Sequence, residues 1–376
     1  MLFEGGQLMF KKKTFLLEDI SLHLDEYLKT MYAEDENKVN FEVLIHSNRI
    51  PLDFSCATNR KNTPFHISGI GKMFTATLIS LLVDQGKLQF RDLISKYFSG
   101  KELDSLFLVN GIDYSNAVTI EQLLAHTSGI ADYFEGPVLS GISFKEDLMR
   151  NRNIFWKPEM LLNFSRINQV AQAKPGEKFY YSETGYVLLG RLIEKITGKS
   201  YADNIKDEFF LPLGMNDSYL LYLTEPINQP KTAMEAIYLD GVEITAFKSL
   251  SYDSAGSGII STTEDLIRFY ESLRSGKLIK KDTLYALENF TNKYRSGIYY
   301  GLGMMEVHFE DFLILLKSLP RVTGHTGTFG TQLFHDAEND AYIALNFSSS
   351  NNVAKSFRVL VEIENTIRKY KKSKSS

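Results

Sequence analysis

The sequence predicts an α/β protein in which a central antiparallel sheet is flanked by terminal helices and carries an inserted, mostly helical domain. Strand-like runs lie near both ends of the chain, at 40–46, 51–57, 312–316, 321–325, 331–334 and 342–347. Helical patterns fill most of the sequence between these runs. A sheet assembled from both chain ends, with helices inserted between its two parts, is the simplest fold for this order of elements.

Local spacing supports the individual elements. In the first predicted helix, 16–32, apolar residues recur three or four positions apart. Runs 40–46 and 51–57 are separated by a polar tripeptide, which favours a β-hairpin. Residues 70–83 are apolar or small on every face, which is typical of a buried helix. Further helices are predicted at 119–125, 183–197, 201–210, 262–275 and 353–370.

The order of elements also predicts two domains. We assign residues 1–66 and 290–376 to a discontinuous sheet domain and residues 67–289 to the helical domain, a division that suits a chain of 376 residues. Clefts of such proteins tend to lie between domains, so we expect the functional site at this boundary.

Composition excludes several classes of function. A formal net charge of −4 gives no electrostatic reason to expect nucleic acid or an anionic membrane as a partner. Cys56 is the only cysteine, which excludes an internal disulfide and a cysteine-based zinc site, and the seven histidines show no metal-binding spacing. We interpret the lysines near the C-terminus, Lys369, Lys371, Lys372 and Lys374, as a solvated tail.

The N-terminus gives no convincing signal peptide. Lys11 to Lys13 precede an apolar run that Glu18 ends after four residues, whereas a secretory segment needs about 7–15 apolar residues. No stretch approaches the roughly 20 apolar residues of a membrane span. We expect a soluble, cytoplasmic protein, or an extracytoplasmic one if the chain is a processed precursor.

A lysine on the buried helix is the first chemical signal. Lys72 would lie among apolar side chains, where desolvation opposes its charge unless partners are present. Either its side chain reaches solvent from the helix end, or it belongs to an active site. Residues 65–76 resemble the S-x-x-K region of the serine β-lactamase and penicillin-binding family, in particular its class C β-lactamase, D-amino-acid peptidase and esterase branch. That motif places a serine one turn before the lysine, where this chain has Gly69.

A second segment, 175–190, resembles the Y-x-N motif of the same family. The resemblance gives Tyr181 the role of general base or proton relay beside Lys72, which requires a cation to stabilise its phenolate. Glu183 stands where the family has asparagine. A carboxylate at this position cannot donate the hydrogen bond of the amide unless it is protonated.

A third segment, 324–330, looks like the K-T-G strand of the family in its H-x-G form. The resemblance implies substrate binding by Gly327 and Thr328, with the backbone N–H groups of Thr328 and Gly69 as oxyanion donors. His325 would bind a substrate carboxylate or polarise the site. The alternative interpretation is a structural histidine whose ring nitrogens are hydrogen-bonded within a glycine-rich turn.

Two more stretches are similar to the family without being catalytic. Residues 123–130 would order a loop in which Asp132 to Phe134 wall the cleft. Residues 255–265 resemble a glycine-rich entry to a helix, with Ser261 or Thr262 as its N-cap.

The resemblance therefore implies a serine hydrolase that forms an acyl-enzyme on a β-lactam, a D-amino-acid peptide or an ester, and that needs neither a metal nor an organic cofactor. The expected partner is a small-molecule or peptide substrate.

Whether the chain is active depends on the missing serine, and three explanations stay open. The chain is an inactivated variant that Gly69→Ser would restore; or it is a natural non-catalytic relative that binds a peptide or ester; or Ser68 is the nucleophile, four residues before Lys72. Against the last, Ser68 precedes the helix, where its hydroxyl is better used as an N-cap.

Overall fold

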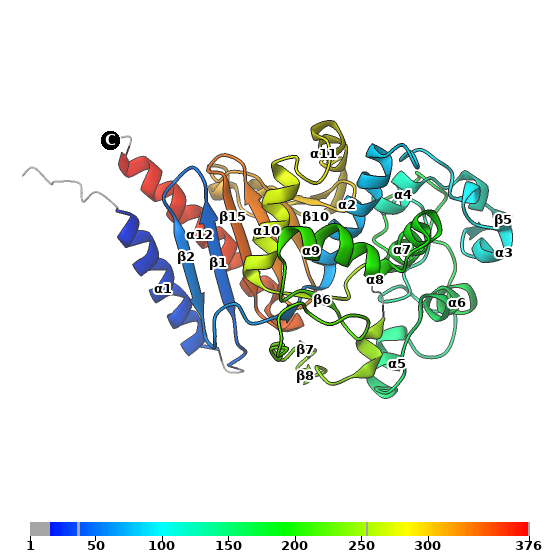
Figure 1. Cartoon of the computed structure of the whole chain (residues 1–376), viewed down its shortest axis with the longest axis horizontal. Coiled ribbons are helices and arrows are strands. Elements are labelled where there is room, and N and C mark those ends of the chain that lie inside the picture. Colours follow the sequence, from blue (N-terminus) through cyan, green and yellow to red (C-terminus); the bar gives the residue numbers. More distant parts are fainter. Residues whose placement is uncertain (1–15, 36–37, 253–254, 375–376) are drawn as a thin grey trace, which may run out of the picture.

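A computed structural model of the chain describes residues 16–35, 38–252 and 255–374. It confirms the predicted fold class. Eight of the described strands form one antiparallel sheet in the order β10-β11-β12-β13-β14-β15-β1-β2 (Figure 1). These strands are β10 (Asn292–Arg295), β11 (Ile298–Tyr300), β12 (Met305–Val307), β13 (Val322–Thr326), β14 (Gln332–Asp336), β15 (Ala341–Asn346), β1 (Glu42–Ser47) and β2 (Asp53–Ala57).

The two chain ends meet within this sheet. Strand β1 pairs antiparallel with β15 from Glu42↔Asn346 to Ser47↔Ala341, and it pairs with β2 on its other side. The β1–β2 pairing confirms the predicted hairpin. Strand β15 comes from the far end of the sequence, so its pairing with β1 closes a loop of almost 300 residues. The inserted segment lies at one edge of the sheet (Figure 1).

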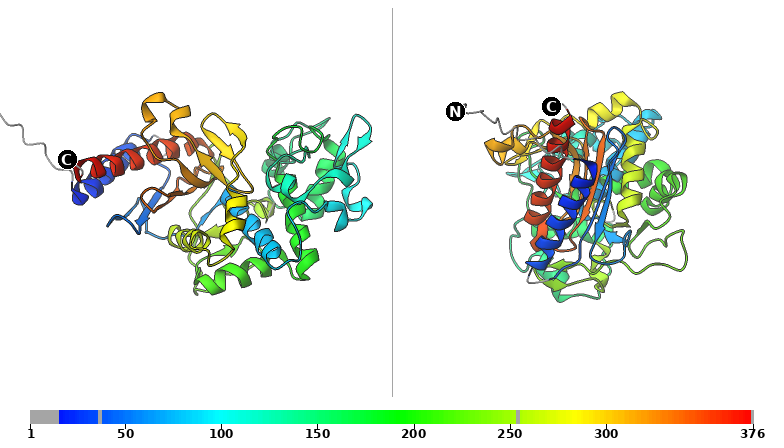
Figure 2. Two further views of the ribbon diagram at one scale, coloured as in Figure 1. Left: turned by 90° about the horizontal axis from the view of Figure 1, so that it is seen from above. Right: turned by 90° about the vertical axis from the view of Figure 1, so that its left-hand side faces the viewer.

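Helices cover both faces of the sheet (Figures 1 and 2). Helices α1 (Leu17–Ala33) and α12 (Val353–Lys374) pack side by side on one face, where Ile20, Leu24 and Leu28 are buried. Helix α10 (Thr263–Arg274) covers the other face and contacts β15 and β1. It lies within the segment predicted as the helical domain, 67–289, and its buried residues pack both on the sheet and on that segment, where Phe269 stacks on Phe74 at 3.7 Å. The division into two domains stays a prediction.

The inserted segment is mostly helical and contains small sheets at its margin. The helices are α2 (Gly71–Asp84), α3 (Gly100–Leu103), α4 (Ile120–Leu124), α5 (Phe144–Arg150), α6 (Pro158–Asn168), α7 (Glu183–Thr197), α8 (Tyr201–Ile205), α9 (Leu211–Leu213) and α11 (Lys281–Leu287). The short strands are β3 (Phe65–His66), β4 (Leu108–Val109), β5 (Ile112–Asp113), β6 (Tyr219–Leu220), β7 (Tyr238–Leu239), β8 (Val242–Glu243) and β9 (Ile259–Ser261). Helix α7 matches its predicted range, whereas α5, α6 and α11 were not predicted.

One predicted strand is wrong. Residues 312–316 do not join the sheet; they form a loop with short 3-10 turns at Phe309–Asp311 and Ile314–Leu316. Strand β12 occupies the sheet position next to β13 instead. An apolar run by itself does not distinguish a buried strand from other apolar segments, and here most of the run is exposed.

The remaining predictions concern the chain ends and membranes. Lys11 to Lys13 lie outside the described residues. In the part of the chain that the structure describes, no helix is long and apolar enough to cross a bilayer.

The carboxyl group of Glu364, on α12, is buried near Asp336 of the sheet. Glu364 is fully buried, and neither of its carboxyl oxygens has a hydrogen-bond partner among the described residues. Burial, and then the negative charge of Asp336 on β14, raise the pKa of Glu364 well above its usual value. The Asp336 carboxylate itself accepts backbone N–H groups from Glu338 and Asn339.

We predict that Glu364→Gln stabilises the protein at neutral and alkaline pH. The unfolded chain releases the Glu364 proton near its ordinary pKa, while the folded chain keeps it to higher pH. Wild-type stability therefore falls as pH rises through this window, by up to about 1.4 kcal/mol per pH unit. The glutamine variant lacks that loss.

Urea unfolding across pH should show that the extra stability of Glu364→Gln over wild type grows above the ordinary carboxyl pKa. The control, Glu26→Gln at an exposed position of α1, should leave the profile unchanged, and parallel profiles for wild type and Glu364→Gln would contradict the assignment.

Candidate active site

The site forms where α2 begins. A 3-10 turn, Ser68–Ile70, leads directly into the helix, and all three of its residues are buried. Lys72, in the first turn of α2, is completely inaccessible to solvent. The alternative in which this lysine reaches water from the helix end is therefore excluded.

Lys72 is neutralised by the glutamate that replaces the expected asparagine. Its Nζ donates to both carboxylate oxygens of Glu183, at 2.7 and 2.6 Å, and to the carbonyl of Gly256 at 3.4 Å. It also lies 5.0 Å from the ring centroid of Tyr181 and 5.2 Å from that of Tyr186. The ammonium group is thus held by both carboxylate oxygens of Glu183 and lies over two aromatic rings.

Tyr181 does not have the electrostatics of a general base. Burial, followed by the negative charge of Glu183, raises the pKa of its hydroxyl well above the ordinary value. Lys72 approaches the face of the ring, and its charge is already matched by the carboxylate. A phenolate is therefore disfavoured, contrary to the proton-relay role that the sequence resemblance implied.

His325 is also unsuited to its predicted role. It is fully buried, and its Nδ1 bonds the carbonyl of Thr326 at 2.6 Å. Since a carbonyl only accepts, Nδ1 carries the proton, and Nε2 accepts from the Tyr300 hydroxyl at 3.2 Å. Burial and then the nearby Lys72 charge lower the pKa of His325 to about 3. A neutral ring with both nitrogens hydrogen-bonded does not bind a substrate carboxylate as a cation, which favours the interpretation of His325 as a structural histidine.

The Ser68 hydroxyl is hydrogen-bonded to Thr328, whose backbone N–H was predicted to bind the oxyanion. The N–H of Thr328 donates to Ser68 Oγ at 2.9 Å. Ser68 has φ +52°, a left-handed conformation that is uncommon for residues other than glycine. Its side chain does not cap the helix, contrary to the prediction. Position 68 thus holds the hydroxyl in place, and one of the two expected oxyanion donors is already bound within the chain.

Position 69 has no room for a side chain. A Cβ built on Gly69 would lie 2.8 Å from the carbonyl oxygen of Thr326 and 3.0 Å from Cε1 of His325. The first of these atoms belongs to the backbone of β13, which pairs with β14 at this position (Thr326↔Gln332). A serine here would have to displace part of that strand.

A cleft of about 360 Å³ opens beside this position, which is within the size range of small-ligand sites. Five of the residues singled out in the sequence line it: Gly69, Tyr181, Glu183, Gly327 and Thr328. Lys72 and His325 lie behind this lining, close to Gly69 and Tyr181 but without exposure of their own. The structure thus brings the three predicted segments together.

The loop after residues 123–130 contributes Asp132 and Phe134 to the cleft wall, as predicted. The Asp132 carboxylate accepts the backbone N–H groups of Phe134, Glu183 and Glu135 at 3.0–3.2 Å. Burial, and then the charge of Glu183, raise its pKa to about 7. The cleft lining includes four carboxyl groups, those of Asp132, Glu135, Glu183 and Asp240, together with the cations Lys145 and Arg295.

Several lining residues were not identified from the sequence. Tyr294, Arg295 and Ile298 come from β10 and β11, and Phe357 comes from α12. Tyr294 stacks on Tyr181 with ring centroids 5.2 Å apart. No short motif marks these positions, because only the sheet order and the packing of α12 bring them to the cleft.

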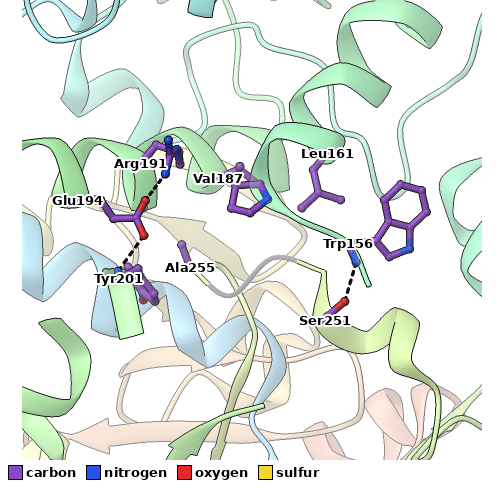
Figure 3. Close-up of a pocket in the computed structure, with 10 residues that line it drawn as sticks. Trp156, Leu161, Val187, Arg191, Glu194, Tyr201, Ser251 and Ala255 are labelled. Carbon is purple, nitrogen blue, oxygen red and sulfur yellow. Dashed lines mark hydrogen bonds and ion pairs between the residues drawn. The ribbon is translucent and has the colours of Figure 1, made fainter. Parts of the chain in front are cut away.

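A second, smaller cavity lies between α6, α7 and α8 and encloses about 30 Å³ (Figure 3). Trp156 and Leu161 line one side, and Arg191, Glu194 and Tyr201 line the other. This volume corresponds to about one water molecule, so the cavity is too small for a substrate.

Comparison with known proteins establishes the family. A family profile described as "Beta-lactamase" matches residues 49–361, which is most of the chain. The chain therefore belongs to the β-lactamase family of serine hydrolases, which is related to penicillin-binding proteins, D-amino-acid amidases and esterases.

Individual relatives agree with this assignment. Penicillin-binding protein 4* of Bacillus subtilis is 32% identical over 245 residues, a match that covers 59% of this chain and 47% of that protein. The chain thus spans about half the length of this relative. A D-stereospecific amidohydrolase from Streptomyces superimposes with a TM-score of 0.73 at 23% identity, over 90% of this chain and 97% of the other. The D-amino acid amidase of Ochrobactrum anthropi gives 0.74 at 22% identity, over 93% and 99%. The two structures show the shared fold.

We predict that Gly69→Ser destabilises the protein by about 1–3 kcal/mol, because the new Cβ overpacks the contact with β13. Urea unfolding measures the effect. The matched control is Gly100→Ser at the start of α3, where a Cβ meets nothing within 4 Å, and it should change stability by less than about 0.5 kcal/mol. A Gly69→Ser protein as stable as wild type would show that the strand accommodates the side chain.

A separate prediction concerns the ion pair between Lys72 and Glu183. Lys72→Met should cost about 3–5 kcal/mol, because it leaves the Glu183 carboxylate without its counter-charge. Adding Glu183→Leu should recover much of that loss, since the double variant buries no charge at either position. A double-mutant cycle by urea unfolding measures the coupling. Additive effects of the two substitutions would show that the pair is not coupled in the folded protein.

Proposed function

We propose that this chain is a non-hydrolytic member of the β-lactamase family that binds a small molecule or peptide in its cleft. The observation that carries the proposal is Gly69, which supplies no nucleophile and whose surroundings leave no space for one. The ion pair of Lys72 with Glu183 supports it, since a lysine held in this way is poorly placed to accept a proton from a serine.

The proposal differs from that of an enzyme inactivated by a single substitution. In that case the remaining site would be arranged around the absent serine, and Gly69→Ser would restore activity. Three other features oppose restoration: the close approach of Thr326, the carboxylate at Glu183, and the bond from the Thr328 N–H to Ser68. These features belong to three separate segments, which favours a site adapted to a role other than acyl transfer.

Ser68 is not supported as an alternative nucleophile. Its hydroxyl accepts from the Thr328 N–H, and Lys72 Nζ is bonded to Glu183 and Gly256. His66, the nearest histidine in sequence, uses its Nδ1 to accept the backbone N–H of Ser68, not the hydroxyl proton. A serine nucleophile needs a base within hydrogen-bond reach, and these groups do not provide one.

The cleft favours a ligand with an apolar or aromatic group and a polar end. Tyr181, Tyr294 and Phe357 form an aromatic wall, while Asp132 and Glu183 supply carboxyl oxygens. The structural relatives named above include an amidase of D-amino acids. A D-amino-acid derivative that is bound but not cleaved is therefore the first ligand class to examine.

The covalent test uses a fluorescent penicillin and a fluorophosphonate with intact-mass detection. We expect no labelling of wild type or of Gly69→Ser. The triple variant Ser68→Gly/Gly69→Ser/Glu183→Asn, which frees the Thr328 donor and removes the carboxylate, is the matched attempt at restoration. Labelling of Gly69→Ser alone would identify an inactivated enzyme, and labelling of wild type that Ser68→Ala abolishes would identify Ser68 as the nucleophile.

The binding test measures D-phenylalanine amide and N-acetyl-D-alanyl-D-alanine by calorimetry, with the amounts of each compound followed by chromatography. We expect binding without turnover. Tyr294→Ala should weaken it at least about tenfold, because an aromatic contact of the ligand is lost. Tyr285→Ala, on α11 and 67% exposed, is the control and should have no effect. Product formation by wild type would contradict the proposal.

A further inference from the structure

The loop between β12 and β13 exposes a continuous apolar surface. Phe312, Leu313, Ile314 and Leu315 are 42, 51, 67 and 79% exposed. The orange segment that contains them projects beside α12 in both views of Figure 2. Isolated exposed apolar residues are ordinary on protein surfaces, but four in succession at the tip of one loop indicate a site of interaction.

The base of this loop is anchored while its tip is presented to solvent. Phe309 and Leu319 are buried in the core beneath the sheet, at 0 and 6% exposure. Phe312 packs edge-on against Phe357 of α12, with ring centroids 6.1 Å apart. The tip, Leu313–Leu315, has no equivalent burial. We refer to residues 312–316 as the apolar loop.

Basic side chains accompany the apolar loop, while its acidic residues are engaged. Glu310 pairs with Arg321 at 3.1 Å, and Asp311 accepts from the Tyr299 hydroxyl at 2.9 Å. Lys317 follows the loop directly and is exposed. Glu310 and Asp311 still balance Arg321 and Lys317 in charge, so the loop itself is close to neutral, and the positive charge beside it comes from α12.

The end of α12 adds positive charge beside the apolar loop. Arg368 donates to the hydroxyl of Ser318 at 2.6 Å and to the amide oxygen of Asn365 at 3.1 Å, both neutral groups. Lys372 lies one turn further along the same face of the helix and is exposed. The lysines predicted as a solvated tail therefore belong to α12, and the bond from Arg368 to Ser318 places this end of the helix beside the apolar loop.

We propose that the apolar loop and the adjoining basic end of α12 dock this protein on the surface of an anionic lipid bilayer. An apolar tip enters the interfacial region, and lysine and arginine beside it are attracted to acidic headgroups. A second copy of the chain fits the surface less well. A few side chains of leucine size cover far less than the roughly 800 Å² per partner of a standard interface, and two such surfaces would bring like charges together.

The position of the loop relates this surface to the cleft. Phe357 contacts Phe312 on one side and lines the cleft on the other. Docking would therefore hold the cleft close to the bilayer. The proposal does not depend on whether the site binds or cleaves its ligand.

Vesicle flotation of the full chain tests the proposal. The probes are phosphatidylcholine vesicles and vesicles of phosphatidylcholine with phosphatidylglycerol. Wild type should float with the anionic vesicles only, and added salt should weaken the binding. Ile314→Ser/Leu315→Ser should reduce binding at least tenfold, and Lys317→Gln/Lys372→Gln should reduce it severalfold. Ile167→Ser, 71% exposed on α6, is the control and should bind like wild type.

A fluorescent probe reports the insertion directly. Leu315→Cys can be labelled selectively with an environment-sensitive dye, because the only native cysteine, Cys56, is buried. We expect a blue shift with anionic vesicles. Failure of wild type to bind them, or equal binding by Ile314→Ser/Leu315→Ser, would overturn the proposal. Self-association that this double variant abolishes would instead identify the surface as a contact between copies.

Discussion

A buried ammonium group requires a counter-charge, and the arrangement of this site follows from how Lys72 obtains one. Glu183, at the first turn of α7, binds the Lys72 ammonium through both of its carboxylate oxygens. The pair joins α2 to α7 at the base of the cleft. Burial is the main reason that the pKa of the Tyr181 hydroxyl is raised and that of His325 lowered, and the pair adds to both shifts through the charge of Glu183 and of Lys72 respectively. The same interaction thus joins the two helices and sets the charges around the cleft.

A second feature of the site is the order of Ser68 and Gly69 before α2. The hydroxyl lies at position 68, where it accepts the N–H of Thr328, and the residue next to it has no side chain. The cleft nevertheless remains open and lined by aromatic and acidic groups. These two observations are the basis of the proposal that the chain binds a ligand in this cleft without cleaving it. A separate surface, the apolar loop with the basic end of α12, lies beside the same cleft.

Much of the fold could be predicted because its signals are local. The spacing of apolar residues placed α1, α7 and α10 within a few residues, and the polar tripeptide between two strand-like runs marked the β1–β2 hairpin. The apolar run at 312–316 was misassigned, since residue type alone does not tell whether a neighbouring strand is available. Helix α10 has an ordinary amphipathic pattern, and only the tertiary structure shows that it covers the sheet.

For the site, the sequence by itself determined the identity of the critical positions: glycine at 69, lysine at 72, glutamate at 183, and the three segments that meet around them. It could not decide what these groups do to one another. That the lysine is neutralised, that the tyrosine keeps its proton, that His325 is neutral and that β13 leaves no room at Gly69 depend on distances and burial between segments more than 100 residues apart. Charge interactions and packing depend on distances in space and not on separation along the chain, so only the tertiary structure decides these features of the site.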